Sequence, residues 1–335
     1  METNSQRAWK SLSRLPDVVT DELILSYRQA LEDIRATIAR LYSTYMAEGE
    51  LTKAQLTQFM RVSNIEREIV DIMRPYVAQS TQTIQRASQA GIEGSFFKHA
   101  WAVEQAAGVR LGWGQLSDTA VRAAAGIGGD LAELEGILSK SEIEQHRRIL
   151  ADAFDKTYPK DTQRWISRAV RDGVIQGDSV QKLAKRIEKD GLAKSFSSAE
   201  RIARTETLRA LGIGNQVAFE QAADEGVQVT QVWDATLDAA TRPAHAALDG
   251  VEADGDGLWY PASISGGVPG PRRSGVASFD INCRCRTTGN VAGYSPSVRR
   301  IRNEGLQPYT TFKDWATERG FSVNQYGQEY SFLME

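Results

Sequence analysis

Residues 21–50 read DELILSYRQALEDIRATIARLYSTYMAEGE, and the spacing of their apolar side chains decides the fold class of the first half of the chain. The apolar side chains recur at steps of three or four residues, which is the repeat of one α-helical face. The apolar positions are Leu23, Tyr27, Leu31, Ile34, Ile38, Leu41 and Tyr45. Charged side chains such as Glu32 and Arg35 fall off this stripe. The stretch therefore predicts one long amphipathic helix.

The sequence that follows predicts more helices. Thr52 and Gln55 have the spacing of a capping box, which predicts the start of a helix that then ends at Pro75. Helical patterns also cover residues 80–106 and 128–157. The first half of the chain is therefore expected to be almost wholly helical.

After residue 160 the sequence mixes helical and strand patterns. Asp178 or Ser179 is expected to cap one short helix, and a capping box at Ser197 and Glu200 predicts the start of another. Alternating apolar residues predict a strand within 227–236, and FDINCRCRTTGNV at 279–291 reads as the next strand. A Gly/Pro/Ser-rich loop over 250–278 lies between the two strands.

These patterns together predict an α+β fold that is mainly helical in its N-terminal part. We expect a helical region over residues 1–160, a smaller α+β domain over 161–290 and a tail with short helices over 291–335.

Composition excludes several classes of protein. The chain of 335 residues has 40 basic and 43 acidic side chains, a formal net charge of −3 and two cysteines. A chain built to wrap nucleic acid without sequence preference would be strongly basic, and a disulfide-stapled scaffold would be rich in cysteine. The sequence shows neither a signal peptide nor an apolar run long enough to span a bilayer, so no membrane contact is expected.

Both cysteines lie in one short segment, at Cys283 and Cys285. In a strand, residues two apart point to the same face, so the two sulfurs would lie side by side. Such a pair suits burial in a core or joint coordination of a soft metal. A zinc site would need His245 and either Asp234 or Asp238 as further ligands. Zinc binding, packing, and redox or nucleophilic use all stay open at this point.

A polar cluster is expected around the segment WDATLDAATRPAHAALDG at 233–250. The structural interpretation is a buried network that fixes this segment, and its members would be Arg204, Glu206, Trp233, Asp234 and Arg242. The alternative is an enzyme, a hydrolase or transferase, that combines anion binding with acid–base or nucleophilic catalysis. That enzyme would use Arg204, Asp238, Arg242, His245 and Cys285.

The order of the motifs resembles the Mu F-like minor head proteins of tailed bacteriophages, also called phage head morphogenesis proteins. The resemblance rests on five features in sequence: GDSVQKLAKRI, ARTET, WDATLDAATRPAHAALDG, the Gly/Pro-rich loop and NCRC. It covers roughly residues 165–290, and the tail from residue 295 also looks like the usual ending of the family. On family grounds the Asp, His and Cys set looks like a fold-organising site, which favours zinc.

The resemblance implies a low-copy component of the phage head that lies inside it near the portal. Such a protein acts in procapsid assembly, in DNA packaging and delivery, or in both. The implied partners are the portal protein and the major capsid or scaffold protein, with residues 1–160 docking on the portal or the inner shell. The implied location is the virion interior or procapsid, assembled in the host cytoplasm. Family cores are sometimes fused to toxin domains, but only a short tail follows NCRC, so none is expected here.

Two basic patches are candidates for contact with packaged DNA. The arginines concerned are Arg272, Arg273, Arg299, Arg300 and Arg302. Contact of this kind would be electrostatic and would weaken with salt. Solvated loop charge is the alternative, and a DNA-binding scaffold without a head role is a third hypothesis for the whole protein.

Overall fold

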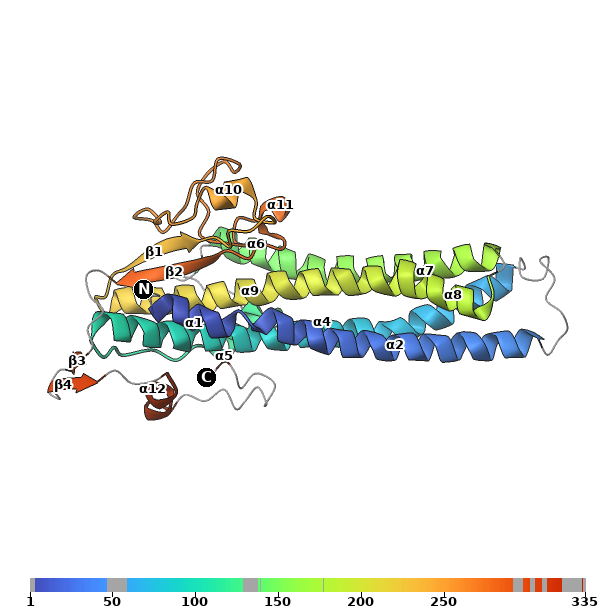
Figure 1. Cartoon of the computed structure of the whole chain (residues 1–335), viewed down its shortest axis with the longest axis horizontal. Helices are drawn as coiled ribbons and strands as arrows, with labels where there is room; N and C mark the ends of the chain where they lie inside the picture. Colours follow the sequence, from blue (N-terminus) through green and yellow to red (C-terminus); the bar gives the residue numbers. More distant parts are fainter. Residues whose placement is uncertain are drawn as a thin grey trace. The chain divides into compact units, whose positions relative to one another are not determined.

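The computed structural model describes residues 4–46, 59–128, 138, 140–176, 178–291, 298–301, 305–308, 312–320 and 333. Long helices dominate it, and two separate two-stranded antiparallel sheets lie in the C-terminal half (Figure 1). The predicted fold class, a mainly helical chain with a smaller α+β part, is confirmed. The capping box expected at Thr52 and Gln55 falls outside the described residues.

The chain folds into two compact units that alternate along the sequence. One unit comprises Val18–Ile84 and Arg148–Ala203, and we call it the helical unit. The other comprises Met1–Asp17, Gln85–Arg147 and Arg204–Glu335, and we call it the mixed unit. The division into functional regions at residues 160 and 290 stays a prediction.

The helical unit buries most of the apolar stripe predicted from residues 21–50; Leu31 is half-buried, and the side chain of Tyr45 is outside the described part of the chain. Of the stripe, Leu23, Ile34 and Ile38 are almost completely buried in α2. The hydroxyl of Tyr27 lies 2.5 Å from that of Tyr158 and 2.6 Å from Oγ of Ser195, so polar groups of three helices pair inside this core. Its residues come from α2 (Leu15–Met46), α4 (Phe59–Ala107), η2 (Ala151–Thr157), α7 (Tyr158–Gln176), α8 (Val180–Arg186), η3 (Ile187–Leu192) and α9 (Ala193–Asp224).

Two helix boundaries predicted from the sequence are wrong. Pro75 lies inside α4, which continues to Ala107. A proline costs a helix roughly 3 kcal/mol, but buried apolar side chains on both sides of it, such as Met73 and Val77, favour continuation. Ser197 likewise lies inside α9. The cap predicted at Ser179 is correct, because its side chain accepts a hydrogen bond from the backbone N–H of Lys182.

The mixed unit packs short elements around the rest of α4 and α9. Strand β1 pairs antiparallel with β2 so that Asp234 lies opposite Arg286. The indole of Trp9 donates to the carbonyl of Thr287 at 2.8 Å, which ties the N-terminal helix to β2. The elements are α1 (Asn4–Leu12), α5 (Asp118–Ala124), α6 (Lys140–Leu150), β1 (Val229–Asp234), α10 (Pro243–Ala246), α11 (Ala277–Asp280), β2 (Arg286–Val291), β3 (Val298–Ile301), β4 (Gly305–Pro308) and α12 (Phe312–Glu318).

A buried carboxylate fixes α12 to α4. Glu104 is completely buried and accepts hydrogen bonds from the indoles of Trp113 and Trp315 at 3.0 and 2.6 Å. It also accepts from the backbone N–H of Leu111 and forms an ion pair of 2.5 Å with Arg319. One side chain therefore connects three separate segments of the mixed unit.

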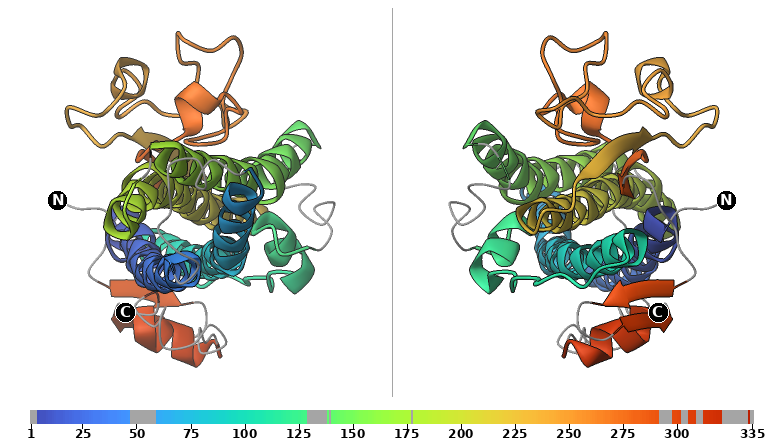
Figure 2. Two further views of the ribbon diagram at one scale, coloured as in Figure 1. Left: turned by 90° about the vertical axis from the view of Figure 1, so that its right-hand side faces the viewer. Right: turned by 90° about the vertical axis from the view of Figure 1, so that its left-hand side faces the viewer.

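The residues between β1 and β2 form a lobe of loops, which we call the loop lobe (residues 235–285). Figure 2 shows this lobe, with its short helices α10 and α11, beside the β1–β2 sheet in both views. It is packed rather than open, because Trp259 and Val268 exchange two backbone hydrogen bonds and are both buried. Its core also contains Trp233, Leu248, Phe279 and the two cysteines.

Candidate metal centre

The site is built from two short segments of the loop lobe. Pro243 occupies the first turn of α10, where its missing N–H costs nothing, and places His245 inside the lobe. The other segment is the turn after α11, in which the N–H of Cys283 donates to the carbonyl of Asp280. The strand predicted over both cysteines is wrong, because β2 begins only at Arg286. Asn282 has a left-handed φ of 58°, which the extended backbone of a strand excludes.

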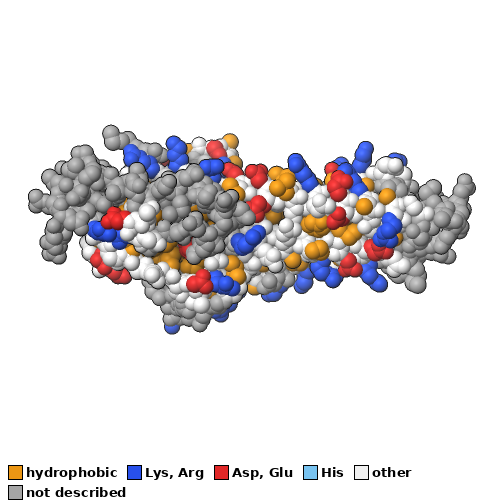
Figure 3. All heavy atoms as spheres, turned by 90° about the horizontal axis from the view of Figure 1, so that it is seen from below, with side chains coloured by type: hydrophobic (Ala, Val, Ile, Leu, Met, Phe, Trp, Pro, Cys, Tyr) orange, Lys and Arg blue, Asp and Glu red, His pale blue; other side chains and the backbone are white. Residues whose placement is uncertain are grey.

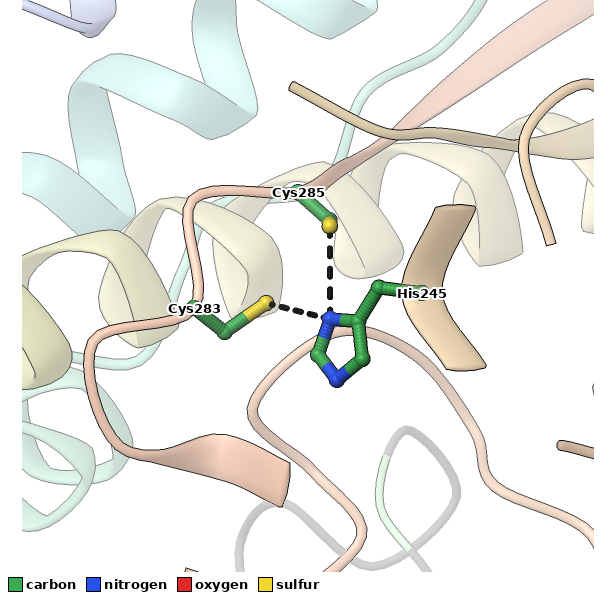
Figure 4. Close-up of side chains that lie close together, drawn as sticks. All are labelled: His245, Cys283 and Cys285. Atoms are coloured by element: carbon green, nitrogen blue, oxygen red, sulfur yellow. Dashed lines mark hydrogen bonds between the residues drawn. The ribbon is translucent and has the colours of Figure 1, made fainter. Parts of the chain in front are cut away.

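The two sulfurs nevertheless lie side by side and face one imidazole nitrogen. Figure 4 shows Cys283 and Cys285 on one side of His245, both directed at Nδ1. Each Sγ lies 3.4 Å from that nitrogen. All three side chains are buried, and their ligand atoms lie within 4.8 Å of one another. These three residues could therefore hold a metal ion.

The distances suit a thiophilic ion with tetrahedral bonds. Zinc binds sulfur at about 2.3 Å and imidazole nitrogen at about 2.0 Å, so tetrahedral angles place the sulfur and the nitrogen roughly 3.6 Å apart. The observed 3.4 Å is close to that separation. Two sulfurs and one imidazole also form a donor set that soft or borderline metals prefer over magnesium or calcium.

Aromatic rings enclose the imidazole. The ring of His245 lies 4.0 Å from that of Phe279 and 5.8 Å from that of Trp233, measured between centroids. Within the described residues, Nε2 of His245 is buried and has no hydrogen-bond partner. The imidazole is therefore oriented by ring packing and by the two sulfurs at Nδ1, since no carboxylate or carbonyl in the described chain binds its other nitrogen.

A buried guanidinium lies behind the two cysteines. Arg272 is only 1% exposed, and its Nη1 donates to the carbonyls of Cys283 and Cys285 at 3.0 and 2.6 Å. Nη1 also lies 3.8 Å from Sγ of Cys283. The hydrogen bond from the Cys285 thiol, the contact with His245 and the charge of Arg272 lower the pKa of Cys283. The neighbouring sulfur and burial raise the pKa of Cys285. The pair therefore favours a state with one shared proton, in which Cys283 is the thiolate and Cys285 the thiol.

Asp238, the fourth ligand considered from the sequence, lies outside this group. Its carboxylate is exposed and forms two hydrogen bonds of 2.5 Å with Arg284. That pairing lowers the pKa of Asp238 to about 2. Asp234 pairs with Arg286 across the β1–β2 sheet at 2.7 Å. Each carboxylate thus has its own arginine, and neither faces the sulfurs.

The other predicted cluster residues have different surroundings. Arg242 donates to the carbonyl of Ile281 at 2.7 Å and so links α10 to the cysteine turn. Glu206 forms a buried ion pair with Arg209, three residues later on α9. Trp233 is completely buried in the lobe core, and Arg204 lies half-buried on α9. The pairing of Asp238 with Arg284 differs from the arrangement that the enzyme alternative requires, in which Asp238 acts beside His245 and Cys285.

The predicted DNA contacts fall in different places. The expectation of a surface contact at Arg272 is corrected, because a completely buried guanidinium cannot reach a phosphate. Arg273 is largely buried and pairs with Glu142 at 2.6 Å. Arg299 and Arg300 lie in β3, and Arg302 is outside the described residues.

The comparisons with known proteins agree with the resemblance seen in the motifs. Residues 164–288 match the family model described as Phage Mu protein F like protein. This segment is similar to that family, and we call residues 164–288 the Mu F-like segment. His245, Cys283 and Cys285 all lie inside the Mu F-like segment, and so does Arg272. No solved structure matches the chain.

Two curated relatives match most of the chain. One is named NAD(+)--arginine ADP-ribosyltransferase EFV, from Enterococcus faecalis (strain ATCC 700802 / V583), and is 27% identical over 316 residues. The match covers 94% of this chain and 60% of that relative. The other is named Minor head protein GP7, from Bacillus phage SPP1, and is 26% identical over 325 residues, which cover 94% of this chain and 97% of the relative. The chain thus spans 60% of the length of the first relative and nearly all of the second.

Sequence reasoning missed the role of Arg272 and of Asp280 in the Mu F-like segment. Asp280 is buried and accepts hydrogen bonds from Ser274 and from the N–H of Gly275, which shapes the loop that carries Arg272. Burial raises the pKa of Asp280. The pattern PRRS reads as exposed charge, and nothing in its composition distinguishes the buried arginine from its neighbour.

Proposed function

We propose that this chain is a minor head protein of a tailed bacteriophage, a low-copy component inside the head near the portal. It would act in procapsid assembly, in DNA packaging and delivery, or in both. The observation that carries this proposal is the match with Minor head protein GP7, which spans 94% of this chain and 97% of that protein. The Mu F-like segment supports the same assignment. The proposed location is the virion interior or procapsid, assembled in the host cytoplasm.

We propose the portal protein and the major capsid or scaffold protein as partners. Figure 3 shows acidic and basic side chains interspersed on the described part of one face, with hydrophobic side chains between them. In the helical unit, pairs such as Arg35–Glu188 and Arg40–Glu68 balance charge locally. A surface of mixed charge suits a protein partner better than a polyanion. Among the described helices, none is long and apolar enough to cross a membrane.

Cosedimentation with the portal oligomer of the same phage tests this assignment. We expect the full chain to be retained at a fixed low ratio. Leu25, on α2 of the helical unit, and Leu237, in the loop lobe, are equally exposed, at 65% and 66%. If the helical unit docks, Leu25→Asp should weaken retention by roughly tenfold, and Leu237→Asp, the matched control, should leave it unchanged. Retention on neither portals nor procapsids would contradict the proposal.

We also propose that His245, Cys283 and Cys285 bind a zinc ion and that this ion has a structural role. The donor set and the 3.4 Å separations support zinc, and a buried structural ion would tie α10 to the cysteine turn. The full chain purified without chelator should contain about one zinc per molecule by elemental mass spectrometry. Cys283→Ser should lose it, because a neutral hydroxyl replaces a thiolate ligand.

Asp238→Asn is the matched variant for the zinc proposal. The carboxylate of Asp238 pairs with Arg284 outside the three-ligand group, so this variant should keep its zinc. Loss of zinc in Asp238→Asn would make Asp238 the fourth ligand. A wild-type chain that binds no zinc would contradict the zinc proposal and leave the head assignment standing, because that assignment rests on the similarity to GP7.

A further inference from the structure

Arg272 is buried without a carboxylate partner among its hydrogen bonds. Its guanidinium donates to three carbonyls, those of Cys283, Cys285 and Leu208, at 3.0, 2.6 and 2.9 Å. Burial lowers the pKa of Arg272, while its Nε has no partner in the described chain. A buried cation is costly unless its surroundings compensate it, and an apolar side chain of similar size would avoid that cost. A guanidinium at this position donates to several carbonyls at once, which an apolar side chain of the same size could not do.

The guanidinium explains how two residues that do not lie in a strand direct their sulfurs to one point. Nη1 of Arg272 bridges the carbonyls of residues that are two apart, and so fixes the backbone on both sides of Arg284. Fixing these two carbonyls restricts the directions of both side chains. The two Sγ atoms then meet Nδ1 of His245 at the same distance.

Arg272 also connects the cysteine turn to α9 through a reciprocal pair of contacts. Its Nη2 donates to the carbonyl of Leu208 on α9. In return, Nε of Arg209 on α9 donates to the carbonyl of Arg272 at 2.8 Å. Arg209 is itself held by Glu206. The backbone at Arg272 has a left-handed φ of 64°, so the surrounding contacts hold this residue in a conformation that side chains rarely adopt.

We propose that Arg272 is a positioning residue of the metal centre: by binding the carbonyls of both cysteines and of Leu208, it holds the two sulfurs in their ligating arrangement against α9. This inference rests on the proposed zinc site. It makes metal affinity depend on a side chain that is not a ligand. It also couples occupation of the site to the docking of the cysteine turn on α9.

The test is zinc affinity of the full chain, measured with zinc alone in competition with a chromophoric chelator at a temperature well below the melting point. Arg272→Met should weaken zinc binding by roughly 10–100-fold, which is typical of residues that orient ligands. Arg272→Lys keeps the charge but replaces the two separate nitrogens, Nη1 and Nη2, by one, so its affinity should also fall. Arg284→Gln is the matched control, since Arg284 lies between the cysteines but pairs with Asp238, and its affinity should stay within about twofold of wild type.

Cobalt substitution separates positioning from general stability. The intensity of the thiolate-to-cobalt charge-transfer band reports how many sulfurs bind, and it should fall in Arg272→Met and Arg272→Lys but not in Arg284→Gln. A purely structural role would lower the melting temperature and leave zinc affinity and the cobalt spectrum unchanged, which would overturn the inference. If Arg272→Met does not fold, Arg272→Lys decides, and wild-type affinity in that variant would overturn it. A wild-type chain that binds no zinc would overturn this inference together with the zinc proposal.

Discussion

Replacing Gly214 by alanine is expected to destabilise the protein by about 3 kcal/mol. A Cβ at Gly214 on α9 would lie 2.0 Å from the carbonyl oxygen of Ile92 and 2.9 Å from the backbone nitrogen of Phe96 on α4. Both contacts are with backbone, so no rotation of a side chain can relieve them. The two helices would have to separate and open the core that Phe96 and Ile213 share.

Gly212→Ala is the matched control for this prediction. Gly212 lies on the same helix, and apart from the adjoining backbone of α9 no atom of the described residues lies within 4 Å of the position that its Cβ would take. Alanine there should stabilise the helix by about 0.5–1 kcal/mol, because glycine has the lower helix propensity. Denaturant unfolding of both variants measures the difference. If Gly214→Ala were as stable as Gly212→Ala, the close approach of α4 and α9 would be wrong.

Replacing Glu104 by glutamine is expected to cost about 3–5 kcal/mol of stability, because it removes one partner of a buried ion pair. Arg319 would then lose this buried carboxylate as its ion-pair partner. An amide also offers only one acceptor oxygen, whereas the carboxylate accepts at both, with Trp315 at Oε2 and Trp113 at Oε1. The C-terminal helix α12 should loosen first, since Trp315 and Arg319 both reach Glu104 from that segment.

Glu144→Gln is the control, because Glu144 is exposed on α6 and should change stability by less than about 0.5 kcal/mol. Denaturant unfolding gives the free energy, and limited proteolysis reports whether the C-terminal segment is released. Unchanged unfolding of Glu104→Gln, with α12 still protected, would show that the carboxylate does not hold α12.

The sequence predicts the helical part of the fold well, because there the signal is the local repeat of apolar residues. The stripe from Leu23 to Leu41 is buried as its spacing predicts, except for Leu31, which is half-buried. The errors occur where distant packing overrides a local rule. Pro75 reads as a helix end, but α4 continues through it, and the capping pair at Ser197 lies inside α9.

Three of the four ligands predicted from the sequence lie together, and the fourth, Asp238, pairs with Arg284 instead. His245, Cys283 and Cys285 were expected to converge, and the structure brings them together. The reason given for the two sulfurs, a shared strand face, is wrong, because a turn and the guanidinium of Arg272 align them instead. Burial of an arginine depends on carbonyls that lie far away in sequence, such as that of Leu208, so no local pattern reveals it.

The protein composition of purified procapsids decides whether the chain is a component of the phage head, as proposed. Quantitative mass spectrometry would compare the amount of this chain with that of the portal protein in procapsids from the phage that encodes it. We expect a low and constant ratio of this chain to the portal protein. The ratio should not fall on washing in high salt, because protein contacts rather than phosphate contacts retain the chain. Procapsids that assemble normally and contain none of this chain would contradict the proposed role in the phage head.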